Sequence, residues 1–516
     1  MAQLAILQPE DPVEFLGNYL LKHVANVEAQ QQLQQRKERS PTVANTSSLV
    51  GTVETTDQES VREKQLEEEK QVQTQLHAES SVALVFQKFL DWICSTLDAE
   101  EAYIGRKAVD PQGNSVVHFV ASSKHSDSKV LDKFVTQPTE EDEETARGGG
   151  VTFDVFKENA PVGEDGNPAV DAEGNPLPAA PPKFVHVENV LREPRVKFFG
   201  VPKLGALLTR AGQYKSYLHA DVNNDSKPEE PNVLEQWLVF YVDTMGQART
   251  FTKNEIDRFR HSTELFLTTL EEKERDLYMK DNERRVSNDE PMLREFLVAF
   301  AAQVAVQEET LSSQLPQPPE GEELSEAAQQ ERSSKEAELR LSFLTALLVS
   351  HIPTLSLASA QVVPFKGFVL STFAAALELL GYFRRELFNP ATGQPSWEKI
   401  SPLLEESMLT ARLQAFEASL VTMGSLAEED KTSAKGLKAI RNALPATSVA
   451  VSQTKQTFGE IAKPEVDAAS PIASCFYAWA LAVIARAESL TTMADQAQQL
   501  EDEAAAAAEA AAAGDE

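Results

Sequence analysis

The apolar run at residues 236–242 (QWLVFYV) constrains the fold more than any other segment of this chain. Aromatic and branched residues dominate the run, and a turn sequence (DTMG, residues 243–246) follows it directly. A continuous apolar run of this length is typical of a strand buried on both faces, which is found in the interior of a sheet. We therefore predict that the middle of the chain contains a sheet with this segment as a central strand.

The rest of residues 80–285 mixes helix and strand signals. Apolar residues recur at helical spacing early in this region, and a hairpin-type turn (DPQGN, residues 110–114) separates two strand-like runs. An insert at residues 138–182 is rich in Glu, Gly and Pro and is expected to be a solvated loop. The predicted elements are a helix at 80–97, strands at 101–106 and 115–121, and a helix that begins near Glu255; residues 184–190 and 198–202 follow the insert.

This order of elements resembles a GAF domain over about residues 80–275, most clearly in the closing segment LVFYVDTMGQARTFTKNEIDRF. The resemblance implies a GAF-like α/β domain of a fold that dimerises and binds small molecules, in some families cyclic nucleotides or bilins. No cysteine is placed for a bilin, and no cyclic-nucleotide motif is evident. We expect a structural scaffold, with a nucleotide-binding domain as the alternative.

A short amphipathic helix is predicted at residues 11–25. Asp11 and Glu14 have the spacing of a capping box, and Pro12 is tolerated at the first helical position. A single helix of this length is marginal in water, so its apolar stripe must pack against a partner. The stripe is formed by Phe15, Leu16, Tyr19, Leu20 and Val24.

The segment DPVEFLGNYLLKHV resembles the Dpy-30 dimerisation and docking motif over about residues 9–35. The resemblance implies that two copies form a four-helix bundle whose groove accepts an amphipathic partner helix, with a second helix at about 25–39. The alternative is an ordinary surface helix packed on its own domain. The residues implied in dimerisation and docking are Pro12, Val13, Phe15, Leu16, Tyr19, Leu20 and Val24.

The fold class expected for the whole chain is multidomain α+β. Dpy-30-like helices (1–40) and a linker (41–79) precede the GAF-like domain (80–285), and a charged helical connector (286–345), an all-α helical bundle (346–496) and an acidic Ala-rich tail (497–516) follow it. Residues 373–387 form an amphipathic stretch with two arginines. It could bind a calmodulin-like partner, but a packed bundle helix is the simpler interpretation.

A basic stretch lies within the helical bundle. It has six basic residues and one acid, Glu460, so its local charge is +5 in a chain whose net charge is −32. Because salt screens distant charges, such a patch can control docking even on an acidic protein. The alternative is a solvated helix face. The basic residues are Lys431, Lys435, Lys438, Arg441, Lys455 and Lys463.

Three segments around this stretch resemble, in order, the microtubule-binding stalk region of dynein heavy chains. They are residues 359–381, the phrase WEKI at 397–400, and residues 466–484. The resemblance implies that the basic stretch and nearby apolar residues contact tubulin. The long flanking heptad helices of a dynein stalk are absent or short, so signalling along a lever is not expected.

Composition excludes several classes of function. The chain has 516 residues, 80 of them acidic and 48 basic, which argues against partners such as nucleic acid or anionic membranes. Cys94 and Cys475 are too few and too distant for a disulfide framework or a zinc site, so buried free thiols are expected. The longest apolar run, 473–485, is shorter than the ~18 residues of a transmembrane helix, and no secretory signal is visible. We expect a soluble intracellular protein.

Function is expected to be non-catalytic, because no phosphate loop, nucleophile elbow or zinc-protease motif is present and no cofactor or metal is implied. A Dpy-30 motif joined to a GAF-like domain resembles the radial spoke protein 2 family. The hypothesis is therefore a docking scaffold of the ciliary or flagellar axoneme, in the cytoplasm and cytoskeleton. Its expected partners are a second Dpy-30 or docking-type chain, an amphipathic helix of an axonemal protein, and tubulin. The alternatives are a cyclic-nucleotide sensor of axonemal motility and a Dpy-30-type adaptor of a chromatin complex.

Overall fold

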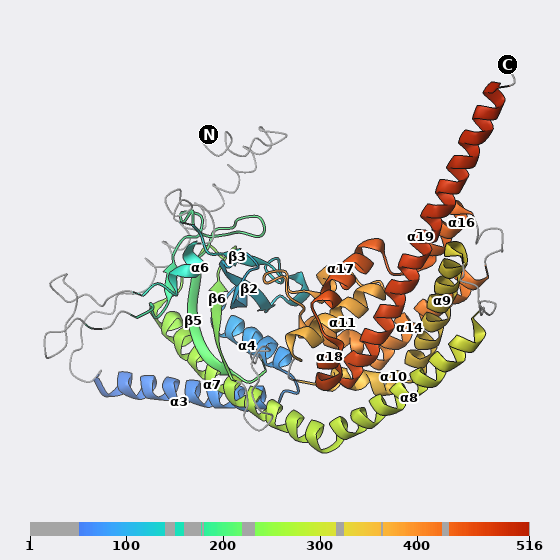
Figure 1. Cartoon of the computed structure of the whole chain (residues 1–516). Helices are drawn as coiled ribbons and strands as arrows, with labels where there is room; N and C mark the ends of the chain where they lie inside the picture. Colours follow the sequence, from blue (N-terminus) through green and yellow to red (C-terminus); the bar gives the residue numbers. More distant parts are fainter. Residues whose placement is uncertain are drawn as a thin grey trace. The chain divides into compact units, whose positions relative to one another are not determined.

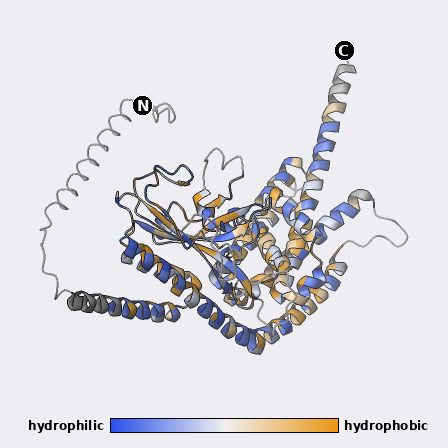
Figure 2. Cartoon of the chain, turned by 90° about the vertical axis from the view of Figure 1, so that its left-hand side faces the viewer, coloured by the Kyte–Doolittle hydropathy of each residue, from blue (hydrophilic) through white to orange (hydrophobic). Residues whose placement is uncertain are grey.

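The computed structural model describes residues 51–139, 150–158, 177, 180–218, 233–315, 325–362, 365–425 and 433–514 (Figure 1). The predicted Dpy-30-like helices and most of the predicted insert lie outside these residues. The chain divides into two units between Lys70 and Gln71. Most of α3 (Gly51–Ala78), which is largely hydrophilic (Figure 2), belongs to the first unit. The following description concerns the second unit.

A curled antiparallel sheet forms the middle of the chain, with the strand order β3-β2-β1-β6-β5-β4 (Figure 1). The predicted central strand is confirmed, because β6 pairs with β1 on one side and β5 on the other. The predicted hairpin is also confirmed, since β1 and β2 pair across the turn at 110–114. The strands are β1 (Glu101–Val109), β2 (Ser115–Ser122), β3 (Phe134–Thr136), β4 (Val185–Val187), β5 (Leu207–Ser216) and β6 (Leu234–Asp243).

Two helices cover one face of this sheet, α4 (Val82–Thr96) and α7 (Lys253–Arg284). Their starts follow from the local sequence: Ser81 caps α4, and Thr252 and Glu255 form a capping box at α7. Aromatic rings join the layers, with Phe89 stacked on Phe266 at a centroid distance of 4.1 Å. The apolar pattern that predicted the helix at 80–97 is therefore the stripe that packs on the sheet.

The opposite face of the sheet is covered by part of the insert that we expected to be a solvated loop. A short helix, α6 (Gly150–Asp154), lies in the insert, and Val151, Phe153 and Val155 are buried against the sheet. The expectation was wrong for these residues because the Glu, Gly and Pro content around them concealed three apolar side chains at alternate positions. The overall composition of the insert therefore did not reveal that three of its side chains pack in the core.

Helices α8 (Glu290–Gln314), α9 (Glu326–Ser350), α11 (Gly367–Leu379), α14 (Glu406–Gly424), α16 (Ala434–Ala443), α17 (Ser448–Gly459), α18 (Lys463–Ala469) and α19 (Pro471–Gly514) form the C-terminal region (Figure 1). They share one hydrophobic core with the short helices α10 (Ile352–Leu355), α12 (Arg384–Leu387) and α13 (Trp397–Ile400). Trp479 of α19 is fully buried and donates a hydrogen bond of 3.1 Å to the hydroxyl of Thr345 on α9.

The predicted connector at 286–345 is not separate from this core. Leu293 and Phe300 of α8 and Leu341 of α9 are buried in the same cluster as the helices that follow. Sequence alone favoured a connector because charged residues are frequent along residues 286–345 and the run 314–321 interrupts them. The predicted tail likewise continues an element of the core, since α19 extends to Gly514.

No linker separates the sheet from the helical region. α7 ends at Arg284, a π-helical segment (η2, Arg285–Asp289) follows at once, and α8 begins at Glu290. Asp281 lies at this junction and is paired with Arg284 at 2.9 Å. The helical backbone thus continues from the sheet face into the C-terminal core.

The first part of the amphipathic stretch 373–387 belongs to the packed bundle helix α11, as the simpler interpretation predicted, and its last four residues form the short helix α12. Phe373 and Leu377 are buried in the core of the helical region. α11 ends at Leu379, and Gly381 has a φ of +92°, a conformation that favours glycine and interrupts the helix. These residues therefore do not form one continuous amphipathic helix.

Both cysteines are free; Cys475 is buried and Cys94 is partly buried. Within the described ranges, no single helix is both long and apolar enough to span a membrane. One bent pair, 328–350 with 352–360, meets the criteria of length and composition when its two parts are taken together.

Candidate functional site

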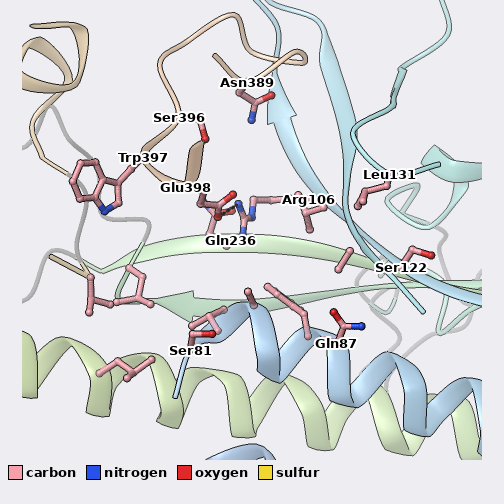
Figure 3. Close-up of a pocket in the computed structure, with 18 of the residues that line it drawn as sticks. Ser81, Gln87, Arg106, Ser122, Leu131, Gln236, Asn389, Ser396, Trp397 and Glu398 are labelled. Atoms are coloured by element: carbon pink, nitrogen blue, oxygen red, sulfur yellow. Dashed lines mark hydrogen bonds and ion pairs between the residues drawn. The ribbon is translucent and has the colours of Figure 1, made fainter. Parts of the chain in front are cut away.

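A cavity of about 760 Å³ lies where the helix-covered face of the sheet meets the loop at residues 389–398 (Figure 3). One side of the cavity is formed by the start of α4, by β1, β2 and β6, and by Leu277 of α7. The loop at 389–398 supplies the other side, with Trp397 and Glu398 at the start of α13. The site is therefore built from segments nearly 300 positions apart in the sequence, since Arg106 and Glu398 are separated by 292 positions.

Arg106 is the charged group of the cavity. It follows Ile104 on the helix-covered face of β1 and lies opposite Leu238 of β6. Its side chain is only 14% exposed, and Nη1 donates a hydrogen bond of 3.2 Å to Oε1 of Glu398, which is 62% exposed. Figure 3 shows the two side chains meeting beside Gln236. The guanidinium is thus inside the cavity while its counter-ion is accessible to water.

The electrostatic surroundings keep Arg106 charged. Burial alone would lower the pKa of its guanidinium, because a low-dielectric site disfavours the charged form. The charge of Glu398, with further contributions from Tyr214 and Glu274, outweighs burial and raises the pKa above its usual value. The cavity therefore presents a permanent positive charge.

Glu274 of α7 partly balances this charge from the same, helix-covered side of the sheet. It is fully buried and accepts hydrogen bonds from the Tyr214 hydroxyl at 3.0 Å, the Ser216 hydroxyl at 2.6 Å and the Tyr217 backbone N–H at 3.0 Å. A buried carboxylate with three donors has its lone pairs well occupied. Glu274 is therefore a structural anchor of this part of the sheet.

Polar and apolar groups share the remaining wall of the cavity. Oε1 of Gln236 and Nε of Arg106 are buried and have no hydrogen-bond partner among the described residues. Apolar wall is provided by Val82, Phe86, Leu277 and Leu370. A cationic donor, a neutral acceptor and apolar surface suit the binding of a small molecule. Elsewhere in the described part of the chain, no group of three or more His, Cys, Asp or Glu side chains could hold a metal ion.

The residues predicted for docking, Pro12 through Val24, lie outside the described residues, as does Lys431. Two of the remaining basic residues, Lys435 and Lys438, are exposed on α16. Lys438 donates a hydrogen bond of 3.1 Å to Gln498 of α19. Lys455 pairs with Glu488 of α19, and Lys463 pairs with Asp467 at 2.7 Å.

Arg441 does not belong to an exposed basic surface. It is 9% exposed, and Nη1 donates a hydrogen bond of 2.8 Å to the backbone oxygen of Ala446. Burial lowers the pKa of its guanidinium. The expectation that Arg441 contacts tubulin is corrected here: its guanidinium satisfies a backbone carbonyl inside the chain.

The local excess of positive charge is reduced by the neighbouring helix. α19 packs beside α16 and places Glu488 and Glu501 near the basic segment. Oε1 of Glu501 accepts a hydrogen bond of 3.0 Å from the backbone N–H of Ala434, at the first turn of α16. Counting charges along residues 431–463 overlooked these acids, which are distant in sequence.

The sheet face opposite α4 and α7 is filled by aromatic rings. Tyr103 stacks on Tyr241 with a centroid distance of 4.9 Å, and Phe119 packs edge-on against both. All three are buried, with Phe153 and Val155 over them in one cluster. A ligand held between this face and its cover would have to displace these side chains.

Comparison with known proteins gives one functional indication. The family model of the Dpy-30 motif matches residues 1–25. The match includes the whole predicted stripe, from Phe15 to Val24, and only the first residue of the second helix predicted at 25–39. The comparison therefore supports the predicted resemblance of the N-terminal segment to the Dpy-30 motif. No curated protein matches the chain.

Sequence reasoning missed Arg106 and Glu398. Arg106 is a single polar residue near the end of a strand, and Glu398 was noticed only within the phrase WEKI. The break in the apolar alternation after Ile104 was the one available signal. It indicated a charged residue on the buried face of the sheet but could not identify its partner.

Proposed function

We propose that this chain is a non-catalytic docking scaffold. The observation that carries the proposal is the Dpy-30 match at residues 1–25, since that motif is a dimerisation and docking module. Two copies of the segment would bury the stripe of Phe15, Leu16 and Leu20 against each other and leave a groove for an amphipathic partner helix.

The architecture of residues 71–516 supports a scaffold role. These residues belong to one compact unit, and the helical backbone continues from α7 through η2 into α8 without a loop. A dimer formed at the N-terminal segment would therefore carry two large folded bodies. Such an arrangement suits a protein that holds partners at defined positions.

The proposed location of the protein is the ciliary or flagellar axoneme, in a radial spoke or neighbouring complex. It depends on the combination of a Dpy-30 motif with a GAF-like domain and a dynein-stalk-like helical region. Because Arg441 is buried and Lys455 and Lys463 are paired with acids, we propose attachment through protein partners at the docking segment. Direct contact with tubulin is the competing arrangement.

Oligomeric state tests the proposal directly. The full chain is expected to be a dimer by light scattering after size exclusion, and deletion of residues 1–25 is expected to leave a monomer. Leu20→Glu places a charge on the stripe and should have the same effect, whereas Asn18→Glu, off the stripe, should leave the dimer intact. A dimer that survives both the deletion and Leu20→Glu would refute the proposed role.

Co-sedimentation with microtubules distinguishes the two modes of attachment. The variant Lys435→Glu/Lys438→Glu changes two exposed lysines. If attachment depends on docking partners, this variant and the unaltered full chain should sediment with microtubules to the same extent. Salt-sensitive sedimentation that the double variant loses would instead favour a tubulin contact.

A further inference from the structure

We propose that the cavity around Arg106 binds a small organic carboxylate that also carries an N–H donor and an apolar chain, as an N-acyl amino acid does. The inference is independent of the docking role of residues 1–25. It concerns a site on the helix-covered side of the sheet, not the face filled by Tyr103, Phe119 and Tyr241.

The carboxylate is indicated by Arg106. A guanidinium has five N–H donors in a fork that matches a carboxylate, and it is rarely buried without an anionic partner. Here Nε has no partner among the described residues, and Nη1 makes one hydrogen bond, to Glu398. Donor capacity therefore remains inside the cavity.

Glu398 occupies the position that a ligand carboxylate would take. Its side chain is 62% exposed and comes from the loop side of the cavity, while Arg106 comes from the sheet (Figure 3). Glu398 has other interactions besides this one, and an exposed carboxylate gains little from its pair with Arg106, because water competes well for it. A ligand carboxylate could therefore replace Glu398 on Arg106 at small cost.

The N–H donor is indicated by Gln236. Its Oε1 atom is buried beside Arg106 and accepts no hydrogen bond from any described residue. An unpaired buried acceptor is costly, and a ligand that supplies a donor removes that cost. An amide N–H close to the carboxylate would satisfy Gln236 while the carboxylate contacts Arg106.

The apolar chain is indicated by the size and wall of the cavity. A volume of about 760 Å³ exceeds what a carboxylate and an amide fill, and small-molecule sites span roughly 300–1,000 Å³. Val82 and Phe86 of α4, together with Leu277 and Leu370, provide the apolar wall. Burial of an alkyl chain there is favourable for each methylene removed from water.

Calorimetric titration of the full chain with N-octanoylglycine tests the proposal. We expect saturable binding at one site per chain. The amide of N-octanoylglycine lacks the carboxylate and should not bind, and decanoate lacks the N–H and should bind about tenfold more weakly. Cyclic AMP in the same titration addresses the cyclic-nucleotide alternative and should give no binding to this cavity.

Three variants assign the binding to named groups. Arg106→Gln should weaken binding of N-octanoylglycine by about ten- to a hundredfold, the effect of losing charged hydrogen bonds. Glu398→Gln frees Arg106 and should strengthen binding several-fold. Arg195→Gln is the matched control, because Arg195 pairs with Glu193 and Asp154 outside the cavity.

The Glu398 variant keeps the test decisive if Arg106→Gln does not fold. Absence of binding to both the parent chain and Glu398→Gln would overturn the proposal. So would equal binding of the acid and its amide, or a Glu398→Gln variant that binds no more tightly than the parent. The proposal would be supported if N-octanoylglycine binds more tightly to Glu398→Gln than to the parent and its amide does not bind.

Discussion

The hydroxyl of Tyr214 on β5 donates a hydrogen bond of 3.0 Å to Oε1 of Glu274 on α7, inside the layer between sheet and helix. The other carboxylate oxygen of Glu274 accepts from Ser216 and from the backbone of Tyr217. One carboxylate with no solvent exposure therefore ties the end of a strand to a helix through three donors. Its removal would take this buried acceptor away from all three donors.

Glu274→Leu is expected to lower the free energy of unfolding by about 3 kcal/mol or more, because three hydrogen bonds to a buried carboxylate are lost and the Tyr214 hydroxyl is deprived of its acceptor. Tyr214→Phe takes one donor from the buried carboxylate and leaves the other two in place, so it should cost less, about 1.5–2 kcal/mol. Urea denaturation of both variants measures the difference. Glu283→Gln, at an exposed position of the same helix, is the control, and a loss there equal to that of Glu274→Leu would contradict the explanation.

Asp243 should make stability depend on pH. Burial raises the pKa of its carboxyl to about 7, while its ordinary value is 3.8; Glu101 and Glu100 act in the same direction, and the Met245 N–H and Lys124 oppose it. Between these two pH values the folded chain holds a proton that the unfolded chain releases. This group therefore contributes a loss of stability as pH rises from about 4 to about 7, and the contribution is constant above that range.

Asp243→Asn tests this expectation. The variant should match the parent near pH 4 and exceed it by about 1–3 kcal/mol at pH 8, where ionisation of the buried carboxyl costs the parent stability. Urea denaturation of both proteins at the two pH values gives the comparison, so that other titrating groups cancel. A difference between the proteins that is the same at both pH values would contradict the assignment.

Gly205 marks a close approach of two backbone segments. A Cβ atom at this position would lie 2.3 Å from the backbone oxygen of Thr244, a contact that no side-chain movement can relieve. Gly205→Ala is therefore expected to cost about 2 kcal/mol or more in thermal or urea unfolding. Gly200→Ala is the matched control, because a Cβ there would meet only Lys129 side-chain atoms at 3.8 Å or more. Equal stability of the two variants would refute the close approach.

Arg441→Met should destabilise the helical region and not merely change its surface charge. The substitution leaves the Ala446 carbonyl without the hydrogen bond from Nη1, and we expect a loss of about 1–3 kcal/mol. Lys435→Gln, at an exposed position on the same helix, should change stability by less than about 0.5 kcal/mol. Thermal unfolding of the two variants is the measurement. If Arg441→Met is as stable as the parent, the structural role is contradicted and Arg441 is again a candidate for contact with a partner.

The parts of the sheet that could be predicted were those whose own sequence pattern reflects burial. β6 is apolar along nearly its whole length because both of its faces are covered, and α4 shows a helical stripe because it packs on one face. β5 was not predicted, since Arg210, Gln213 and Lys215 interrupt its apolar residues. Gly212 also weakens the strand pattern of β5. A glycine is present there because a Cβ atom would meet Leu267 of α7.

The candidate site was less predictable than the fold, for a physical reason. Arg106 and Glu398 belong to segments that meet only through tertiary packing, and neither belongs to a motif with fixed spacing. The basic stretch failed in the same way: its charges were counted along the chain, whereas the acids that balance them are on α19. A local sequence pattern shows that a segment has a face to bury or a charge to pair, but it does not show which distant segment packs against it or pairs with it.

The absence of a loop between α7 and α8 has a mechanical consequence. A pull or a twist applied to the C-terminal helices would reach the sheet by two routes, the helical backbone from α7 through the π-helical segment 285–289 to α8, and the ion pair between Arg106 and Glu398. A load on the C-terminal helices would thus be shared between a continuous main chain and a contact between two side chains.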